Sequence, residues 1–384
     1  MDFEYSNEEI LLKDSVDKIV ERHCQFDQRN FHMNSPGGWS SENWNIYGES
    51  GLLGLPFPQR YGGFEGGAIE TMIVMEAFGR ALALEPYFAT VILAGGILQR
   101  AGSAGLCATL LPEIAAGRLL MAFAHAEPQA RYCLSDVVTT ARKEAGQWVL
   151  RGTKSAVLHG NCADKLIVSA RIDGERRDKQ GLALFLVQAD AAGIVRRAYP
   201  THDGLRAADI QLDDVRVAPE NLIGTAGDAF ASIEATIETA TVAGLAEMIG
   251  AIDATYALTL EYLKTRNQFG RPIGEFQALQ HRMADMMVER EMARSMMLYA
   301  TMMLSDPDSA ARKDAVSSAK FQVGRAARFI SQQSIQLHGG IGMTSEYALG
   351  HYFKRLAVLN MQFGDPDHHL GLLADAGADR QRRN

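Results

Sequence analysis

Two short segments of this sequence carry the kinds of residue that hold the pyrophosphate of a dinucleotide. They are Arg266-Asn267-Gln268-Phe269-Gly270 and Gln336-Leu337-His338-Gly339-Gly340-Ile341-Gly342. Arginine offers a planar fork of donors that matches phosphate oxygens, and glycines let backbone N–H groups approach an anion. The sequence contains no GxGxxG or GxxxxGK[ST] motif, so neither a Rossmann site nor a P-loop is predicted. For either segment alone, the alternative is a helix–helix turn with a surface arginine.

A metal site is not predicted. His368-His369, with Asp365 and Asp367 nearby, is the one cluster that resembles a ligand set. Adjacent histidines rarely chelate one ion, and no further ligand spacing supports the cluster. No motif for a serine or cysteine nucleophile is present, and His125, His159 and His338 are interpreted as packing or hydrogen-bonding residues.

Hydrophobic periodicity predicts three domains around these segments. Helical spacing dominates residues 1–118, for example at 68–82 and 103–116, and we expect an N-terminal α-helical domain there. Short β-rich runs separated by turn residues predict a middle antiparallel β domain over 119–225. Long helical patterns return over 226–384 and predict a C-terminal α-helical bundle, with a helix break at Ser305-Asp306-Pro307 and a frayed tail from about 374.

Composition is that of an ordinary globular protein. The 384 residues are 47% hydrophobic and 22% charged, and the net charge of −8 gives no reason to expect nucleic acid or an anionic membrane as a partner. The N-terminus does not resemble a signal peptide, and no apolar run is long enough for a membrane helix. Four cysteines without CxxC spacing predict reduced thiols and a cytoplasmic location.

The order of several motifs resembles the acyl-CoA dehydrogenase family along nearly the whole chain. Within the family, the chain most resembles the small subunits of two-subunit bacterial enzymes, such as pimeloyl-CoA dehydrogenase and steroid side-chain dehydrogenases. The wider resemblance rests on 51–55 with 61–63, 204–206, 213–217 with 221–224, 262–273, and 336–342 with Glu346-Tyr347. The narrower one rests on Met343-Thr344, 351–355 and 363–370.

This resemblance implies a fold, a cofactor and a reaction. The fold class is α+β, mainly α: an N-terminal helical domain, a middle antiparallel β domain and a C-terminal four-helix bundle. The cofactor is FAD, which accepts a hydride because no side chain can carry two electrons reversibly. In the family, one set of residues reaches across a dimer interface to the ADP half of the neighbour's FAD. The corresponding residues here are Arg266, Gln268, Phe269, Gln336, Gly339 and Gly340.

The chain departs from the family at the catalytic base. Family members place a glutamate at one of two points, and these correspond to Ala240 and Phe363 here. Neither residue can remove a proton. Glu247 lies seven residues after Ala240, about 10.5 Å along the same helix face, and is our candidate for a displaced base, whereas Glu238 faces another direction. A solvated or hydrogen-bonded helix glutamate, or a substrate contact, is the alternative for Glu247.

A second departure concerns the flavin ring. Two hydroxyl donors and a stacking indole of the family are replaced by Ala126, Ala156 and Leu158. The short turn that follows is altered too, but we expect Ser135 to align with its end and to contact the cofactor. A degraded pocket on this chain, beside intact contacts to a neighbour's cofactor, predicts a subunit that completes a partner's site.

The predicted function is FAD-dependent α,β-dehydrogenation of an acyl-CoA thioester to the 2-enoyl-CoA, as one subunit of a hetero-oligomer. The expected partners are the acyl-CoA substrate and a larger paralogous subunit, and electron-transfer flavoprotein is a candidate partner. Two alternatives remain open: a catalytically silent scaffold subunit that completes the partner's FAD site, or an oxidase of the same fold, since fold does not settle the reaction.

Overall fold

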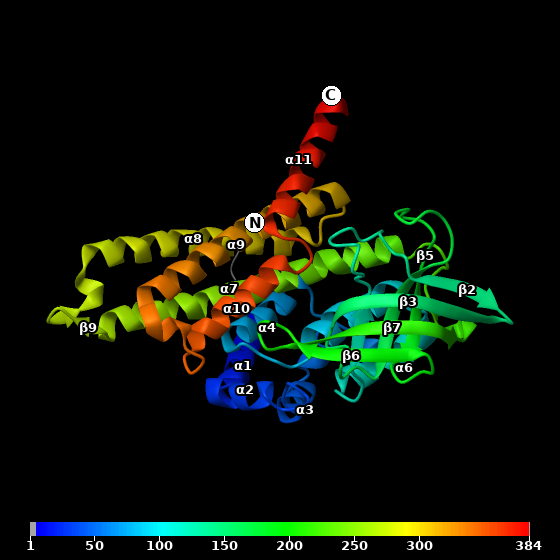
Figure 1. Cartoon of the computed structure of the whole chain (residues 1–384), viewed down its shortest axis with the longest axis horizontal. Helices are drawn as coiled ribbons and strands as arrows, with labels where there is room; N and C mark the ends of the chain where they lie inside the picture. Colours follow the sequence, from blue (N-terminus) through cyan, green and yellow to red (C-terminus); the bar gives the residue numbers. More distant parts are fainter. Residues whose placement is uncertain (1–4, 384) are drawn as a thin grey trace. The chain divides into compact units, whose positions relative to one another are not determined.

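The computed structural model describes the backbone of residues 5–383 and the side chains of residues 5–378 (Figure 1). Along the chain, helices come first, then a β-sheet, then helices again, which confirms the predicted fold class. The chain forms two compact units that interleave in sequence. Unit 1 contains the segments up to Asn30, Ala68–Ala83 and from Thr241 onward, and unit 2 contains Phe31–Gly67 and Leu84–Ala240.

Unit 1 is helical. Its N-terminal helix begins at a capping box, in which Ser6 Oγ accepts from the Glu9 N–H and the Glu9 carboxylate accepts from the Ser6 N–H. The predicted break near Pro307 is present, and Asp308 caps the next helix by accepting from the Ala310 N–H at 2.9 Å. The α-helices that lie wholly or partly in this unit are α1 (Asn7–His23), α2 (Phe26–Met33), α4 (Ala68–Ala81), α7 (Phe230–Thr265), α8 (Gln277–Met303), α9 (Ser309–His338), α10 (Ala348–Met361) and α11 (Pro366–Arg383).

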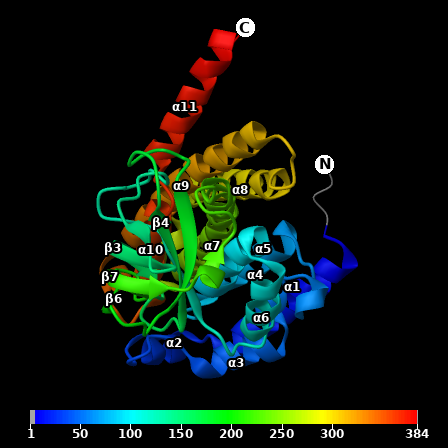
Figure 2. The same cartoon turned by 90° about the vertical axis from the view of Figure 1, so that its right-hand side faces the viewer.

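Unit 2 is built on an eight-stranded sheet in the order β6-β7-β3-β2-β4-β5-β8, with β1 beside β4. Most neighbouring strands are antiparallel, as predicted, but β1 and β2 pair with β4 in parallel. Figures 1 and 2 show β6, β7 and β3 side by side. The strands are β1 (Met121–Ala124), β2 (Thr140–Glu144), β3 (Gln147–Leu158), β4 (Lys165–Arg171), β5 (Leu182–Gln188), β6 (Ile194–Pro200), β7 (Arg206–Val217) and β8 (Leu222–Ile223).

Burial within the sheet follows strand position. Every residue of β5 except Gln188 is buried, as expected of a strand covered on both faces. The edge strand β6 is largely exposed and carries Arg196 and Arg197, charged residues that discourage pairing with another chain. Trp148 and Phe185 meet edge to face in the core, with ring centroids 5.3 Å apart.

Unit 2 also contains several shorter helices. The segment Phe88–Gly95 is a π-helix and continues directly into α5. All of its residues are buried, so its small and apolar side chains pack inside the protein. The α-helices of this unit are α3 (Ser41–Glu49), α5 (Gly96–Ala101) and α6 (Ala104–Ala115), and the 3-10 turns are Leu52–Gly54, Gln59–Tyr61 and Pro219–Asn221.

The long helix α7 is apolar enough, by length and composition, to cross a membrane. Within its most apolar window, however, 78% of the residues are buried inside the protein. A core helix passes the same test, and the burial of Leu245, Met248 and Ile252 gives α7 that role.

The C-terminal helix α11 runs further than the sequence predicts. We expected fraying from about 374, but the described backbone remains helical through Arg383. Ala374, Ala376 and Ala378 are strong helix formers, so the local preference of this segment is helical despite its polar composition.

Two glycines allow α4 and α7 to approach closely within unit 1. A Cβ atom on Gly79 would collide with the carbonyl oxygen of Glu247, and one on Gly250 would collide with the carbonyl oxygen of Glu76. Both glycines are helical and buried, so their cost in helix propensity is offset by the backbone contact that they permit. The helix pair therefore has no room for even one methyl group at either position.

We expect Gly250→Ala to destabilise the protein by about 1–3 kcal/mol, because the added methyl group forces the two backbones apart. Urea denaturation measures the change. Gly371→Ala is the matched control, since Gly371 lies in α11 with no atom within 4 Å of the added Cβ. The control should be neutral or stabilising by about 0.5–1 kcal/mol from helix propensity. Equal stability of the Gly250 variant and the wild type would contradict this account of the packing.

Candidate cofactor site

The first predicted cofactor segment is a β-hairpin between α7 and α8. Strands β9 (Asn267–Gln268) and β10 (Arg271–Pro272) pair in antiparallel register, and the 3-10 turn Ile273–Glu275 follows them. Phe269 and Gly270 form the two-residue turn with φ angles of 55° and 78°, the positive values that a type I′ hairpin turn requires. The turn thus holds a phenylalanine in a backbone conformation that usually favours glycine or asparagine.

The side chains of this hairpin face solvent. Phe269 is 90% exposed and meets the ring of Phe276 edge to face at 6.0 Å. Arg266 is also exposed, and its guanidinium makes no hydrogen bond or ion pair with any residue that the structure describes. Gln268 uses one amide hydrogen on the backbone oxygen of Asn267 and leaves its other groups exposed. The hairpin therefore presents an available cation and a large uncovered ring.

The second segment caps the end of α9. Gly339 has a φ of 64°, a conformation that glycine adopts without strain. Added Cβ atoms on Gly339 or Gly340 would meet nothing within 4 Å, so the backbone there is open to a close approach. Gln336, one turn earlier, is exposed, and its amide has no hydrogen-bond partner among the side chains and backbone described.

An aromatic stack joins the two segments within unit 1. The imidazole of His338 stacks on Tyr262, four residues before Arg266, with ring centroids 4.4 Å apart. Its Nδ1 pairs with the Ser334 carbonyl at 2.9 Å, and its Nε2 pairs with the Tyr347 hydroxyl at 3.3 Å. Burial lowers the pKa of His338, which favours its neutral form. Sequence reasoning assigned His338 to packing but did not identify its two tyrosine partners.

These residues fit the pyrophosphate of a dinucleotide. The guanidinium of Arg266 and the amide of Gln336 are unpaired donors among the described residues, and the backbone at Gly339 and Gly340 is uncovered. Charge-assisted bonds from arginine and backbone N–H groups are the interactions that phosphates select. What the arrangement can do chemically is bind and orient an anion, since it contains no base or nucleophile.

Glu247, the candidate displaced base, forms a buried ion pair in unit 1. Its carboxylate oxygen Oε1 accepts from Nε and Nη2 of Arg355 in α10, both at 2.6 Å. Glu247 is 3% exposed and Arg355 is 6% exposed. A carboxylate already engaged by a guanidinium fork is typical of a structural ion pair, which is the hydrogen-bonded alternative weighed for this residue.

Ala240 and Phe363, the two positions that correspond to the family's base, differ in backbone conformation. Ala240 is fully buried in α7. Phe363 follows α10 with a φ of 58°, and its carbonyl oxygen lies 3.1 Å from His369 Nε2. The buried ammonium of Lys320 donates to the carbonyl of Gln362 at 2.9 Å. The backbone around Phe363 is thus anchored through its carbonyl groups by α9 and α11.

A buried ion pair in unit 2 links β3 to the segment that follows β1. Lys154 Nζ lies 2.7 Å from Glu127 Oε1, and both side chains are fully buried. Glu127 also accepts from the backbone N–H groups of Val138 and Thr139, at 2.8 and 3.1 Å. Burial alone would raise the pKa of Glu127, but Lys154 and these donors lower it to about 2. This pair fixes the start of the connection between β1 and β2.

The three positions that the family resemblance assigns to the flavin ring carry none of the expected groups. Ala126 and Ala156 are exposed methyl groups, and Leu158 is apolar, so no hydroxyl or indole is available at these three positions. Ala156 has a φ of 50° and lies at a bulge between β3 and β7. Its N–H donates to Asp209 Oδ1 at 3.2 Å, so this backbone donor is already engaged.

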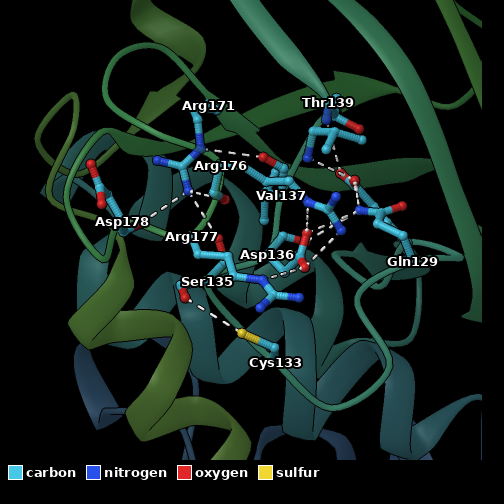
Figure 3. Close-up of polar contacts among 12 residues, drawn as sticks. Gln129, Cys133, Ser135, Asp136, Val137, Thr139, Arg171, Arg176, Arg177 and Asp178 are labelled. Atoms are coloured by element: carbon cyan, nitrogen blue, oxygen red, sulfur yellow. Dashed lines mark hydrogen bonds and ion pairs between the residues drawn. The ribbon is translucent and has the colours of Figure 1, made fainter.

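Ser135 lies in the connection between β1 and β2, which is drawn with its neighbours in Figure 3. The residue is 8% exposed, and its hydroxyl lies 3.6 Å from the Cys133 thiol. Its carbonyl oxygen accepts from Arg171 Nη2 at 2.9 Å. The structure places Ser135 in unit 2, apart in sequence and element from the Arg266 hairpin of unit 1.

No metal centre is found in the part of the chain that the structure describes, where no three His, Cys, Asp or Glu residues are grouped closely enough to hold an ion. His369 is used for structure: its Nδ1 lies 3.1 Å from Ser317 Oγ, and burial lowers its pKa to about 4.

Comparison with known proteins identifies the family. Sequence models of three consecutive domains match the chain: the N-terminal domain of acyl-CoA dehydrogenase at residues 6–118, the middle domain at 122–215 and the C-terminal domain at 227–377. The chain therefore belongs to the acyl-CoA dehydrogenase family, whose members are oxidoreductases that act on CH–CH groups with FAD as the cofactor.

Individual relatives agree with this assignment. The probable acyl-CoA dehydrogenase YngJ of Bacillus subtilis (strain 168) is 31% identical, over 91% of this chain and 92% of that protein. Among solved structures, the Tcur3481-Tcur3483 steroid ACAD is 27% identical with a TM-score of 0.87, covering 98% of this chain and 99% of that one. The ChsE4-ChsE5 complex from Mycobacterium tuberculosis is 25% identical with a TM-score of 0.89 and the same coverage.

Because the Glu247–Arg355 pair is buried, we expect Glu247→Gln to destabilise the protein by about 3–5 kcal/mol, the cost of removing one partner of a buried ion pair. Thermal and urea denaturation measure the loss. Glu261→Gln is the matched control on the exposed face of α7 and should change stability by less than about 0.5 kcal/mol. A stable Glu247→Gln variant that has lost acyl-CoA-dependent flavin reduction would instead support the displaced-base hypothesis.

Proposed function

We propose that this chain is one subunit of a hetero-oligomeric acyl-CoA dehydrogenase and that it completes the FAD site of a larger homologous subunit. The observation that carries the proposal is a contrast within the chain. Among the described residues, the side chains of Arg266 and Gln336 in unit 1 have no partner, and the glycine segment presents open backbone to an external ligand. The ring end in unit 2 has lost its donors at Ala126, Ala156 and Leu158.

The reaction removes a proton from the α-carbon and a hydride from the β-carbon of an acyl-CoA thioester, and a C=C bond forms between the two carbons. When bound, FAD supplies the hydride acceptor. The proton requires a carboxylate held against the α-carbon. Ala240 and Phe363 cannot supply it, and Glu247 is engaged by Arg355, so this chain supplies the base only if Glu247 is released from that ion pair, and the larger subunit supplies it otherwise.

The comparisons support a paired assembly without specifying it. The similar Tcur3481-Tcur3483 and ChsE4-ChsE5 proteins carry two-component names, and the second is described as a complex. The resemblance to small subunits of two-subunit enzymes points in the same direction. It also points to bulky, dicarboxylic or ring-bearing acyl chains as the substrate class. Electron-transfer flavoprotein is the candidate acceptor of the electrons.

A catalytically silent scaffold is the second candidate function, and the Glu247–Arg355 pair favours it. In that case the chain supplies cofactor contacts and interface area, but no group of its own touches the reacting carbons. The two candidates differ in one measurable respect. A displaced base at Glu247 makes turnover of the assembled enzyme depend on that carboxylate, whereas a scaffold does not.

Arg266→Ala should weaken FAD binding by the assembled oligomer by about 10- to 150-fold, which corresponds to the loss of one charge-assisted hydrogen bond of about 1.5–3 kcal/mol. Gln336→Ala should have a smaller effect, because its amide is a neutral donor. FAD affinity is measured by fluorescence titration of the apo-oligomer. Lys264→Ala, an equal loss of charge two residues away, is the control and should change affinity by less than about threefold. Unchanged affinity in Arg266→Ala would remove this hairpin from the cofactor site.

The isolated chain should associate but contain little FAD and show little turnover. Mixed with a larger homologue that carries a base at one of the two family positions, it should form a hetero-oligomer with about one FAD for each pair of chains. The measurement is the flavin-to-protein ratio of the separate and mixed chains, together with acyl-CoA-dependent dye reduction. A homo-oligomer with one tightly bound FAD per chain and ordinary turnover would overturn the proposed function.

A further inference from the structure

A buried guanidinium in unit 2 joins two loops at one end of the sheet. Arg171, the last residue of β4, is 7% exposed. It lies between residues 129–137, here called the Ser135 loop, and residues 172–181, here called the β4–β5 loop. Figure 3 shows Arg171 with its hydrogen bonds directed to both loops.

The hydrogen bonds of Arg171 all end on backbone oxygens. In the Ser135 loop, Nε donates to Val137 O at 3.2 Å and Nη2 donates to Ser135 O at 2.9 Å. The other donors reach the β4–β5 loop, where Nη1 and Nη2 bind four further carbonyl oxygens at 2.9–3.3 Å. Those four carbonyls belong to Asp173, Arg176, Asp178 and Gln180.

This arrangement constrains both loops. A buried charge is costly unless hydrogen bonds satisfy it, and none of the hydrogen bonds of Arg171 in the described structure goes to a carboxylate. The six carbonyl groups must therefore converge on the fork for the side chain to remain buried. A lysine ammonium offers three donors from one point and cannot reproduce this pattern.

A second connection joins the same two loops one residue further along. The carboxylate of Asp136 is fully buried and accepts from Arg176 Nε and Nη2 at 2.6 and 2.9 Å, and from Arg177 Nε at 3.0 Å. These bonds, foremost those from Arg176, lower the pKa of Asp136 to about 2. The carboxylate therefore stays ionised, and the connection persists, across the neutral range.

Ser135 is held on both sides by these contacts, whereas its hydroxyl is only weakly engaged. Its own carbonyl is bound by Arg171, and the next side chain is bound by Arg176. In the described structure the hydroxyl pairs with the thiol of Cys133 at 3.6 Å, a weak interaction. The backbone is thus fixed while the hydroxyl remains able to accept a stronger partner.

We propose that Arg171 is a positioning residue that, with the Asp136–Arg176 pair, fixes the Ser135 hydroxyl for contact with the cofactor. This inference rests on the expectation that Ser135 contacts the cofactor, and on the weak FAD binding that the proposed function leaves to this chain alone. It assigns to the β4–β5 loop a role in cofactor binding through main-chain carbonyls, although the side chains of that loop need not touch the cofactor.

Cys133 provides a native probe of the Ser135 loop, since its thiol is exposed and lies beside Ser135. The full-length chain is treated with iodoacetamide, and labelling rates are followed by mass spectrometry. Cys107 is buried and reports global unfolding in the same sample. FAD is titrated to about 1 mM, which registers even binding as weak as about −4 kcal/mol.

In the wild type, FAD should slow the labelling of Cys133. Arg171→Lys should label Cys133 at least about tenfold faster without FAD, because the loop opens locally, and should need at least about tenfold more FAD for the same protection. Ser135→Ala should weaken the protection without accelerating basal labelling. In the double variant of Arg171→Lys and Ser135→Ala, the FAD requirement should match that of Ser135→Ala alone, because without the Ser135 hydroxyl Arg171 has no cofactor contact to position.

Wild-type labelling and wild-type FAD protection in Arg171→Lys would overturn the inference, and so would additive losses in the double variant. If Arg171→Lys also labels Cys107, the variant has unfolded, and Arg176→Gln decides the question. Arg176 has a side chain 49% exposed, and Arg177 still pairs with Asp136 when Arg176 is replaced, so the fold is retained and faster labelling of Cys133 alone is expected. Unchanged labelling in Arg176→Gln would then overturn the inference.

The same experiment separates this inference from the proposed function. If FAD fails to protect Cys133 in the wild type, Ser135 is removed from the cofactor site, whatever the labelling rates of the Arg171 variant. If FAD protects the wild type and Ser135→Ala loses protection, but Arg171→Lys behaves as the wild type, the cofactor contact stands and the positioning role of Arg171 fails.

Discussion

The stacking of His338 against Tyr262 is the interaction on which the exposed cofactor segments depend. Tyr262 belongs to the last turn of α7 and His338 to the last turn of α9, so a single ring pair at 4.4 Å connects two segments that are more than sixty residues apart in sequence. The Tyr347 hydroxyl closes the other side of the imidazole. Because both helices are long and packed through their buried faces, this junction determines where the hairpin and the glycine turn project.

The two compact units differ in where their polar groups lie. In unit 1 the polar groups of Arg266 and Gln336 are exposed. They carry no desolvation cost, because water solvates them until a ligand binds. Unit 2 keeps the buried Glu127–Lys154 pair and the Arg171 hydrogen bonds, yet has methyl groups at Ala126 and Ala156. Unit 2 therefore contains buried polar anchors, while Ala126 and Ala156 offer no side-chain donor.

Sequence patterns predicted the long helices and the buried strands because their apolar residues repeat at a clear period. The strands β2 and β6 give no such signal, because most of their residues are exposed. The hairpin and glycine segments were found from residue types alone. Arg355 and Arg171 were not, because a buried arginine looks like any surface arginine until the tertiary fold brings a carboxylate or six carbonyl groups around it. The predicted domain boundaries and the roles of the site residues remain predictions.

The backbone around Phe363 has a consequence for how such subunits change over evolutionary time. Lys320 and His369 bind the carbonyl groups of Gln362 and Phe363 and make those contacts without using the side chain at position 363. The left-handed conformation there is thus maintained independently of which residue occupies the position. Loss of a carboxylate at this point leaves the loop intact, and its return requires no remodelling of the main chain. A glutamate introduced at position 363 would therefore meet a main chain that is already held in place.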